Sequence, residues 1–238
     1  IDGLFDQNKL DEVSHVLQRE QQWQTQKHSY SALYVNDKKW QKTPDTERFV
    51  QRDLWDRTAL CAQKAPSAIA LEFLQFLRGH EFMSLLSRLF KVKITDINLA
   101  KPEMNTNYFR LSASDFVNQH ADDSPGREIC MLLYLNKDWQ HNNGGELVFM
   151  GKDEQPVQIA PLFNRCVLFD PSSEGAEHWV NALSSEKNIA KNMAMSKAST
   201  FGSSTANPTS NTTTNTTTSS TTSNGPYRYN VTSWYWSE

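Results

Sequence analysis

The spacing of apolar residues changes in character about 90 residues into the chain. Residues 10–17 place apolar side chains at helical spacing behind the polar Asp6, which predicts an amphipathic helix capped by that aspartate. The apolar segments 68–77 and 82–90, separated by Gly79, predict two further helices. Residues 1–91 are therefore expected to form a helical N-terminal support.

From residue 92 onward, short apolar runs alternate with turn residues, as is typical of β-strands. The expected strands are 94–99, 129–135, 146–150, 157–159 and 166–169, with a last aromatic strand at 227–236. The turn sequence NNGG at 142–145 separates two of them. Many short strands after a helical segment predict a β-sandwich or β-barrel with supporting helices.

A low-complexity tract precedes the last expected strand. Of the 26 residues from 199 to 224, 22 are Ser, Thr or Asn, and so few apolar groups cannot offset the chain entropy lost on ordering. Because an aromatic, strand-like segment follows the tract, we interpret 184–226 as an insertion. The prediction is one domain, 1–238, whose β core comprises 92–183 and 227–236.

The composition argues against several classes of function. Lys and Arg total 24 against 27 Asp and Glu, which gives a formal charge of -3 and a pI near 6.1. No global basic field therefore favours nucleic-acid binding. No apolar run approaches the roughly 20 residues that span a bilayer, so no membrane association is expected. Three widely spaced cysteines argue against a disulfide framework and favour a reducing, cytoplasmic compartment.

His120 and Asp122 stand two residues apart at the end of an expected strand, 116–119. Alternate residues of a strand face the same side, so these two side chains can bind one metal ion. His178, which follows the expected strand 166–169, is the candidate third ligand. Two imidazoles and one carboxylate on one side of an iron form the facial triad of non-haem Fe(II) oxygenases. The tripeptide alone is a weak signal, and its context adds the specificity.

Ordered motifs surround this triad. YLNKDW stands at 134–139, GGEL at 144–147 and RYNVTSW at 228–234. Together with the two histidines and the aspartate, this pattern resembles the 2-oxoglutarate- and Fe(II)-dependent oxygenases of the prolyl-hydroxylase type. The resemblance implies a mainly β fold with N-terminal helices and a double-stranded β-helix (jelly-roll) core. It also implies that His120, Asp122 and His178 bind Fe(II), with 2-oxoglutarate and O2 as co-substrates and ascorbate as a reductant.

Arg228 has a chemical rationale that is independent of the resemblance. The distal carboxylate of a dicarboxylic 2-oxo acid needs a buried cation with paired donors, and arginine provides them. Thr232 shares a strand face with Arg228 and can offer its hydroxyl to the same carboxylate. By resemblance, Tyr108 borders the co-substrate, and Arg127 and Trp234 are expected on the substrate side.

Two features depart from the family pattern. Leu133 stands where the oxygen-sensing relatives carry a tyrosine that touches the co-substrate, so a different donor set is expected around 2-oxoglutarate. Arg228 follows His178 by 50 residues, far more than in the relatives, because the insertion lies between them. The entropy of loop closure grows only slowly with length, so the β core can tolerate this insertion.

The resemblance implies an oxygenase that converts 2-oxoglutarate to succinate and CO2 while it hydroxylates a substrate. Prolyl residues of a protein or peptide are the favoured substrate class. The same chemistry on a free amino acid or small metabolite is the enzymatic alternative, and a non-catalytic β-barrel binding module is the alternative from another class. The presence of Asp122 favours hydroxylation, because related halogenases lack this carboxylate.

Overall fold

The computed structural model describes residues 1–29, 49–57, 68–95, 105–184 and 227–237. The helices of this part are α1 (Gln7–Arg19), α3 (Ala68–Leu77) and α4 (His80–Phe90). The strands are β1 (Trp23–Ser29), β2 (Phe49–Trp55), β3 (Ile94–Thr95), β4 (Thr106–Leu111), β5 (Phe116–His120), β6 (Arg127–Tyr134), β7 (Leu147–Phe149), β8 (Val157–Ile159), β9 (Cys166–Phe169), β10 (His178–Val180) and β11 (Arg228–Ser237).

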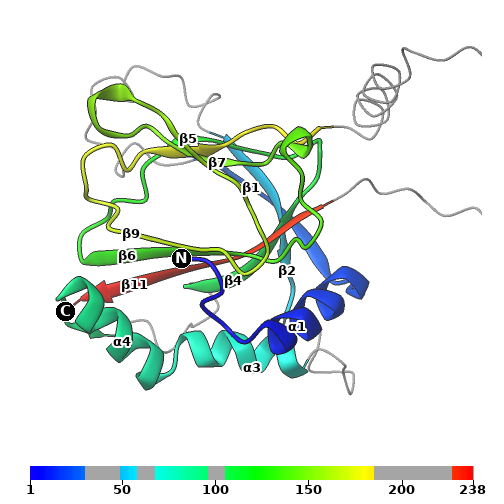
Figure 1. The fold of residues 1–238 in the computed structure, drawn as a ribbon, viewed down its shortest axis with the longest axis horizontal. Coiled ribbons are helices and arrows are strands. Elements are labelled where there is room, and N and C mark those ends of the chain that lie inside the picture. Colours follow the sequence, from blue (N-terminus) through cyan, green and yellow to red (C-terminus); the bar gives the residue numbers. More distant parts are fainter. Residues whose placement is uncertain (30–48, 58–67, 96–104, 185–226, 238) are drawn as a thin grey trace, which may run out of the picture.

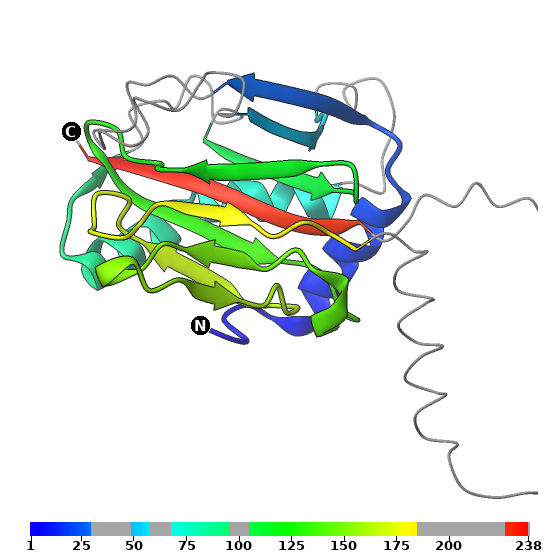
Figure 2. The same ribbon diagram turned by 90° about the horizontal axis from the view of Figure 1, so that it is seen from above.

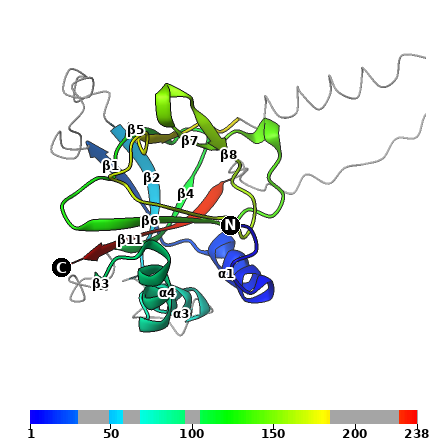
Figure 3. The ribbon, with the colours of Figure 1, turned by 60° about the vertical axis from the view of Figure 1, so that its left-hand side comes forward.

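These strands form one antiparallel sheet that curls into a half-open barrel (Figure 1). The order is β8-β7-β10-β5-β2-β4-β11-β6-β9, with β1 on β2 and β3 on β11. Figure 2 shows the curled sheet from above. Figure 3 shows β6 and β11 next to the helices, with β5, β7 and β8 forming the wall across from them. The sheet thus has an inner face and an outer face.

The three helices cover the outer face, as their sequence patterns require. In α1 the Asp6 side chain accepts a hydrogen bond from the Lys9 backbone N–H at 2.9 Å, which satisfies one free donor of the first turn. Leu10 and Leu17 of this helix are buried against Leu74 and Tyr229 in one cluster. The predicted helices at 68–77 and 82–90 are confirmed as α3 and α4, which begin at Ala68 and His80.

Strand β11 lies between β4 and β6 and determines which side chains face the barrel interior. Arg228, Asn230, Thr232 and Trp234 alternate along it, and directly paired residues of neighbouring strands share a face. Their partners are Leu111, Phe109 and Asn107 on β4 and Tyr134, Leu132 and Cys130 on β6. The intervening Val231 and Tyr235 point to the helices, where both are fully buried.

The N-terminal 91 residues are not purely helical, and this part of the prediction is wrong. Strands β1 and β2 belong to this segment, and β2 lies between β5 and β4. The sequence of β1, WQTQKHS, is mostly polar, so it carries no periodic apolar signal; its strand conformation depends on pairing with β2. The predicted insertion, 184–226, lies outside the described residues except for Ser184, and so does its Ser/Thr/Asn tract.

The strands predicted at 157–159 and 166–169 are confirmed with the same bounds as β8 and β9, and those at 129–135, 146–150 and 227–236 with small shifts. The NNGG turn is also confirmed. Gly144 and Gly145 both adopt positive φ, and a Cβ on Gly144 would lie 2.1 Å from the Ala182 carbonyl oxygen. Only glycine fits there without a shift of the backbone.

Candidate functional site

The described structure brings His120, Asp122 and His178 together. His120 ends β5 and His178 begins β10, and the two residues are direct partners in the antiparallel pair. Their ring centroids are 4.2 Å apart. One potential ligand atom from each histidine and from Asp122 lies within 4.8 Å of the others, and all three residues are buried. The strand pairing thus brings together two histidines that are 58 positions apart in sequence.

Backbone carbonyls orient both imidazoles. Nδ1 of His120 donates to the Asn118 carbonyl at 2.8 Å, and Nδ1 of His178 donates to the Ala176 carbonyl at 2.9 Å. A carbonyl oxygen can only accept, so the proton lies on Nδ1, and Nε2 carries the lone pair that can bind a metal. The two Nε2 atoms lie 3.7 and 3.9 Å from the Asp122 carboxylate oxygens.

The electrostatics of the site favour metal binding near neutral pH. Burial and the neighbouring His178 lower the pKa of His120 to about 3, so its imidazole is neutral. Burial alone would raise the pKa of Asp122, but the surrounding histidines, Arg127 and Trp234 lower it to about 2. Two imidazoles and one carboxylate, close together and buried, are a donor set that suits a divalent transition metal.

The Asp122 carboxylate is held by two residues that were expected on the substrate side. Nε1 of Trp234 donates to Asp122 Oδ2 at 2.9 Å. The Arg127 guanidinium donates to the Asp122 backbone carbonyl, and its Nη1 lies 3.7 Å from Oδ1. In the described structure these polar contacts of both side chains are with a candidate metal ligand, and this geometry is that of residues that orient a ligand.

Trp234→Phe should weaken metal binding about 10- to 100-fold, the usual cost of losing a contact that orients a metal ligand. The change keeps an aromatic ring but removes the donor to Asp122 Oδ2. Trp236→Phe is a matched control, because Trp236 Nε1 has no hydrogen-bond partner in the described structure. Titration with Mn(II), followed by its paramagnetic resonance, measures the effect; equal affinities in the two variants would contradict this role.

Arg228 is 2% exposed and faces the barrel interior. Its Nη1 donates to Asn230 Oδ1 at 3.2 Å, and Asn230 Nδ2 donates to Thr232 Oγ1 at 2.9 Å. Within the described residues, Nε and Nη2 of Arg228 have no partner. A buried guanidinium with two unpaired donors on one edge is costly unless an anion completes it, and a carboxylate fits that edge with two parallel hydrogen bonds.

The turn before β7 fixes the course of the Arg228 side chain. A Cβ on Gly145 would lie 3.0 Å from Arg228 Cδ, and Gly145 has φ +81°. On the other side, Asn136 accepts from the Tyr229 N–H at 2.8 Å and donates to the Tyr227 carbonyl at 2.7 Å. The YLN and GGEL motifs therefore pack against the beginning of β11, next to the guanidinium.

The expectation for Tyr108 is wrong. Tyr108 pairs with Val231 on the outer face, its hydroxyl donates to the Ala70 carbonyl at 2.9 Å, and its ring packs on Trp55. It is a core residue beneath α3. Arg228 and the metal-binding side chains lie on the opposite face, so Tyr108 does not border a ligand next to Arg228.

Sequence reasoning missed Tyr134. Leu133 pairs with Val231 and points to the helical core, whereas Tyr134 pairs with Asn230 and faces the interior. The Tyr134 ring centroid lies 4.8 Å from the Arg228 guanidinium carbon, and its buried hydroxyl has no partner in the described structure. Neighbouring residues of a strand face opposite sides of the sheet, so Leu133 and Tyr134 cannot both face Arg228. The alternation of apolar and polar residues along this strand was the signal that could have identified Tyr134.

The structure also bears on the cysteines, on membrane insertion and on the sequence Asn-Val-Thr at 230–232, which matches the N-glycosylation pattern Asn-x-Ser/Thr. Cys130 and Cys166 are buried free thiols, as the apolar runs around them suggest. Asn230 is 3% exposed, which leaves no space for a glycan. Among the described helices, none has both the length and the apolar character that crossing a membrane requires.

Comparison with known proteins places this site in a family. The family model described as the 2OG-Fe(II) oxygenase superfamily matches residues 105–236, more than half of the chain. This chain is a member of that superfamily. The matched segment contains the histidine–aspartate triad and Arg228. Membership implies Fe(II) as the metal and 2-oxoglutarate and O2 as co-substrates. It supports an oxidoreductase of the dioxygenase class, as the sequence motifs predict.

A curated relative agrees with this assignment. Prolyl 3-hydroxylase OGFOD1 from Mus musculus is 30% identical over 152 residues, which cover 61% of this chain and 25% of that protein. The chain thus spans about a quarter of this curated relative.

Two solved structures share the fold. A prolyl hydroxylase from Trichoplax adhaerens, in complex with a peptide fragment of the hypoxia inducible factor oxygen degradation domain, has a TM-score of 0.56 at 16% identity, covering 99% of this chain and 81% of that chain. A 2OG-Fe(II) oxygenase family protein from Burkholderia pseudomallei has a TM-score of 0.51 at 13% identity, with coverage of 98% and 80%. The predicted jelly-roll fold with helical support is therefore confirmed.

The buried ligands of this oxygenase should make the metal-free protein sensitive to acid. The pKa of His120, about 3, lies below the 6.5 of a free histidine, so between these values the unfolded chain binds a proton that the folded chain excludes. The free energy of unfolding should then fall, as pH is lowered from 6.5, by up to about 1.4 kcal/mol per pH unit from this residue.

Urea denaturation in the presence of a chelator, at a series of pH values, measures this slope. His120→Gln removes the titrating group. The slope of its unfolding free energy against pH should therefore be smaller than that of the wild type by the equivalent of about one proton, while other titrating groups contribute to both slopes. Identical slopes for the two proteins would show that the imidazole titrates normally in the folded state.

Proposed function

We propose that this oxygenase hydroxylates prolyl residues of a protein or peptide, using Fe(II), 2-oxoglutarate and O2. One observation supports the catalytic part most strongly: a complete two-histidine, one-aspartate set lies in the same barrel as a buried arginine with unpaired donors. The substrate class follows from the likeness to a named prolyl 3-hydroxylase.

In this proposal His120 and His178 bind the iron through Nε2, and Asp122 binds it through a carboxylate oxygen. Trp234 occupies Oδ2 with a hydrogen bond, which leaves Oδ1 as the oxygen better placed to bind the metal. When bound, Fe(II) and 2-oxoglutarate supply the oxidative chemistry: the substrate C–H, 2-oxoglutarate and O2 become the hydroxylated product, succinate and CO2.

The protein's own contribution to the co-substrate is a carboxylate site. Arg228 would receive the distal carboxylate on its Nε and Nη2 edge, while Asn230 holds Nη1. The Tyr134 ring lies 4.8 Å from the Arg228 guanidinium carbon, and its buried hydroxyl has no partner in the described structure. The Thr232 hydroxyl, in contrast, accepts a hydrogen bond from Asn230. We therefore assign Thr232 to orienting Asn230, and Tyr134, with Arg228, to the carboxylate.

Mass spectrometry of proline-containing peptides, after incubation with the protein, Fe(II), 2-oxoglutarate, ascorbate and O2, tests the proposal. A gain of one oxygen atom is expected on a proline, and a matched peptide with alanine at that position should stay unmodified. Oxygen on a free amino acid or small metabolite, with peptides untouched, would instead support the enzymatic alternative. Absence of succinate under all conditions would support the binding module.

A further inference from the structure

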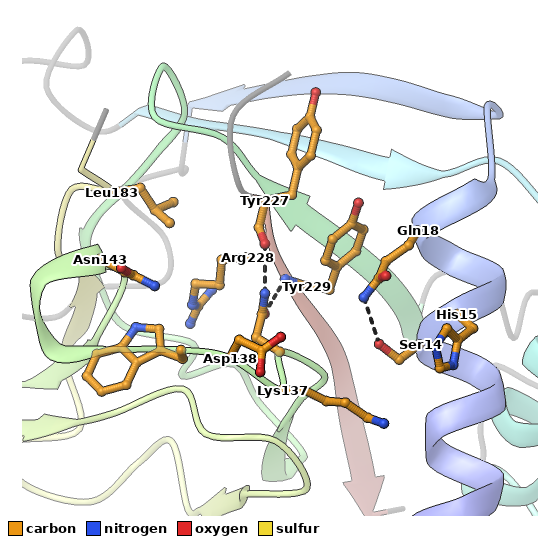
Figure 4. Close-up of a pocket in the computed structure, with 12 residues that line it drawn as sticks. Ser14, His15, Gln18, Lys137, Asp138, Asn143, Leu183, Tyr227, Arg228 and Tyr229 are labelled. Atoms are coloured by element: carbon orange, nitrogen blue, oxygen red, sulfur yellow. Dashed lines mark hydrogen bonds between the residues drawn. The ribbon is translucent and has the colours of Figure 1, made fainter. Parts of the chain in front are cut away.

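The two ends of β11 lie in different surroundings. Where the strand begins, Arg228 and residues of α1 contribute to the wall of a cavity of about 370 Å³ (Figure 4). His120, Asp122 and His178 do not line this cavity. Further along β11, Trp234 donates to Asp122, so the candidate ligands lie beside the second half of the strand. The side chains around this metal end therefore decide how firmly the ligands are held.

One row of paired residues runs from the two histidine ligands to an aromatic residue. His120 of β5 pairs with His178 of β10, which in turn pairs with Phe149 of β7. Directly paired residues of neighbouring strands share a face of the sheet, so Phe149 lies on the inner face beside His178. The centroids of these two rings are 5.4 Å apart.

A second row reaches His178 from the other side of the barrel. Trp234, the residue that donates to Asp122, lies on β11. Its partner on β6 is Cys130, and the partner of Cys130 on β9 is Phe169, so Phe169 also lies on the inner face. The centroid of the Phe169 ring is 5.2 Å from that of His178.

The two rows meet in a contact between Phe149 and Phe169. Their ring centroids are 4.9 Å apart at an interplanar angle of 78°, an edge-to-face geometry that aromatic pairs favour. Among the described strands, β9 is one end of the sheet and β7 lies next to the other end, β8, and no backbone pairing joins β9 to either of them. Side chains alone therefore close the sheet at the metal end.

We propose that Phe149 and Phe169 are positioning residues of the metal centre, and we call their contact the aromatic closure. The closure joins the row that holds the histidines to the row that holds Trp234, the residue that orients Asp122. Its loss would let the imidazoles and the carboxylate move apart. This role rests on the proposed function, in which these three ligands hold the metal.

The closure also restricts the orientation of the His178 ring. One hydrogen bond, from Nδ1 to the Ala176 carbonyl, does not by itself fix the plane of the imidazole. Phe149 meets that plane at 43° and Phe169 meets it at 75°. Two rings packed in different directions leave little space for other orientations of the imidazole, so Nε2 is held where a metal can bind it.

The Mn(II) affinity of the full chain tests this role. Phe169→Leu keeps an apolar side chain but removes both ring contacts, and it should weaken Mn(II) binding about tenfold, the lower end of what losing support around a metal ligand costs. Phe169→Tyr keeps the ring and should bind Mn(II) like the wild type. Phe73→Leu is the matched control, because its ring packs against Phe5 and Phe76 on the helical side; it should lower stability but not metal affinity.

A double-mutant cycle tests whether the two rings act through their contact. If they do, the loss of Mn(II) affinity caused by Phe149→Leu should be smaller by about threefold or more in the Phe169→Leu background than in the wild type. Losses that simply multiply would show that each ring packs independently and that their contact holds nothing together.

NMR of the metal-free protein with ¹⁵N-labelled histidine gives a readout that a general loss of stability does not move. The Nδ1–H signal of His178, identified by its absence in His178→Ala, should exchange faster with water in Phe169→Leu and be unchanged in Phe73→Leu. The role is overturned if Phe169→Leu matches the wild type in Mn(II) affinity and exchange, or if Phe73→Leu weakens Mn(II) equally. A wild type that fails to bind Mn(II) would instead overturn the proposed function.

Discussion

His178→Ala should abolish succinate production and weaken metal binding by more than the 10- to 100-fold that loss of an orienting contact costs. The variant leaves one imidazole and one carboxylate, and the structure shows no fourth His, Cys, Asp or Glu in the described cluster to replace the lost ligand. Mn(II) titration gives the metal affinity, and succinate release under air gives the turnover.

His141→Ala is the control for this change. His141 lies in the turn at 141–143, its side chain is 92% exposed, and it does not belong to the triad. It should bind metal and turn over like the wild type. If His178→Ala retained the metal affinity of His141→Ala, His178 would not be a ligand.

Arg228→Met should raise the KM for 2-oxoglutarate by about 30- to 4,000-fold, which corresponds to about 2 to 5 kcal/mol for truncating a buried, hydrogen-bonded charge pair. Methionine keeps much of the buried stem volume but removes every donor on the guanidinium. Metal affinity should change little, because the Arg228 guanidinium bonds to Asn230 and not to a member of the triad within the described residues. The measurements are succinate release against 2-oxoglutarate concentration and Mn(II) titration.

Arg165→Met provides a matched control, because Arg165 pairs with Asp2 near the surface, at 2.6 Å. Its KM for 2-oxoglutarate should match that of the wild type. Comparable losses of metal and co-substrate affinity in Arg228→Met would mean that the arginine supports the fold as a whole and is not a carboxylate site.

The sequence was sufficient to predict the parts of the site that local strand geometry controls. The H-x-D spacing places His120 and Asp122 together, and the alternation in RYNVTSW places Arg228, Asn230 and Thr232 on one face. The structure shows these groupings. The helices were equally predictable, because a polar cap at Asp6 and a continuous apolar stripe are local signals.

The remaining features depend on pairing between distant strands. Trp234 reaches Asp122 only because β11 and the segment after β5 meet in the barrel, and nothing in the local sequence encodes that contact. The sequence analysis placed Leu133 instead of Tyr134 next to the co-substrate, and it placed Tyr108 there as well. Both errors arose because the register of the strands was unknown, and a shift of one residue moves every side chain of a strand to the opposite face. Strand β1 was missed because its sequence is mostly polar. Strand β2 was missed because its apolar residues stand in adjacent pairs at its two ends and do not alternate with polar ones.

Anaerobic titration of the metal-free protein with Fe(II) and then 2-oxoglutarate tests the central claim most directly. A co-substrate that chelates a triad-bound iron gives a weak visible metal-to-ligand charge-transfer band, and the account predicts this band for the wild type and for His141→Ala. The band should be absent in His178→Ala. A wild-type protein that binds both components but shows no band would contradict a shared iron–2-oxoglutarate site in this barrel.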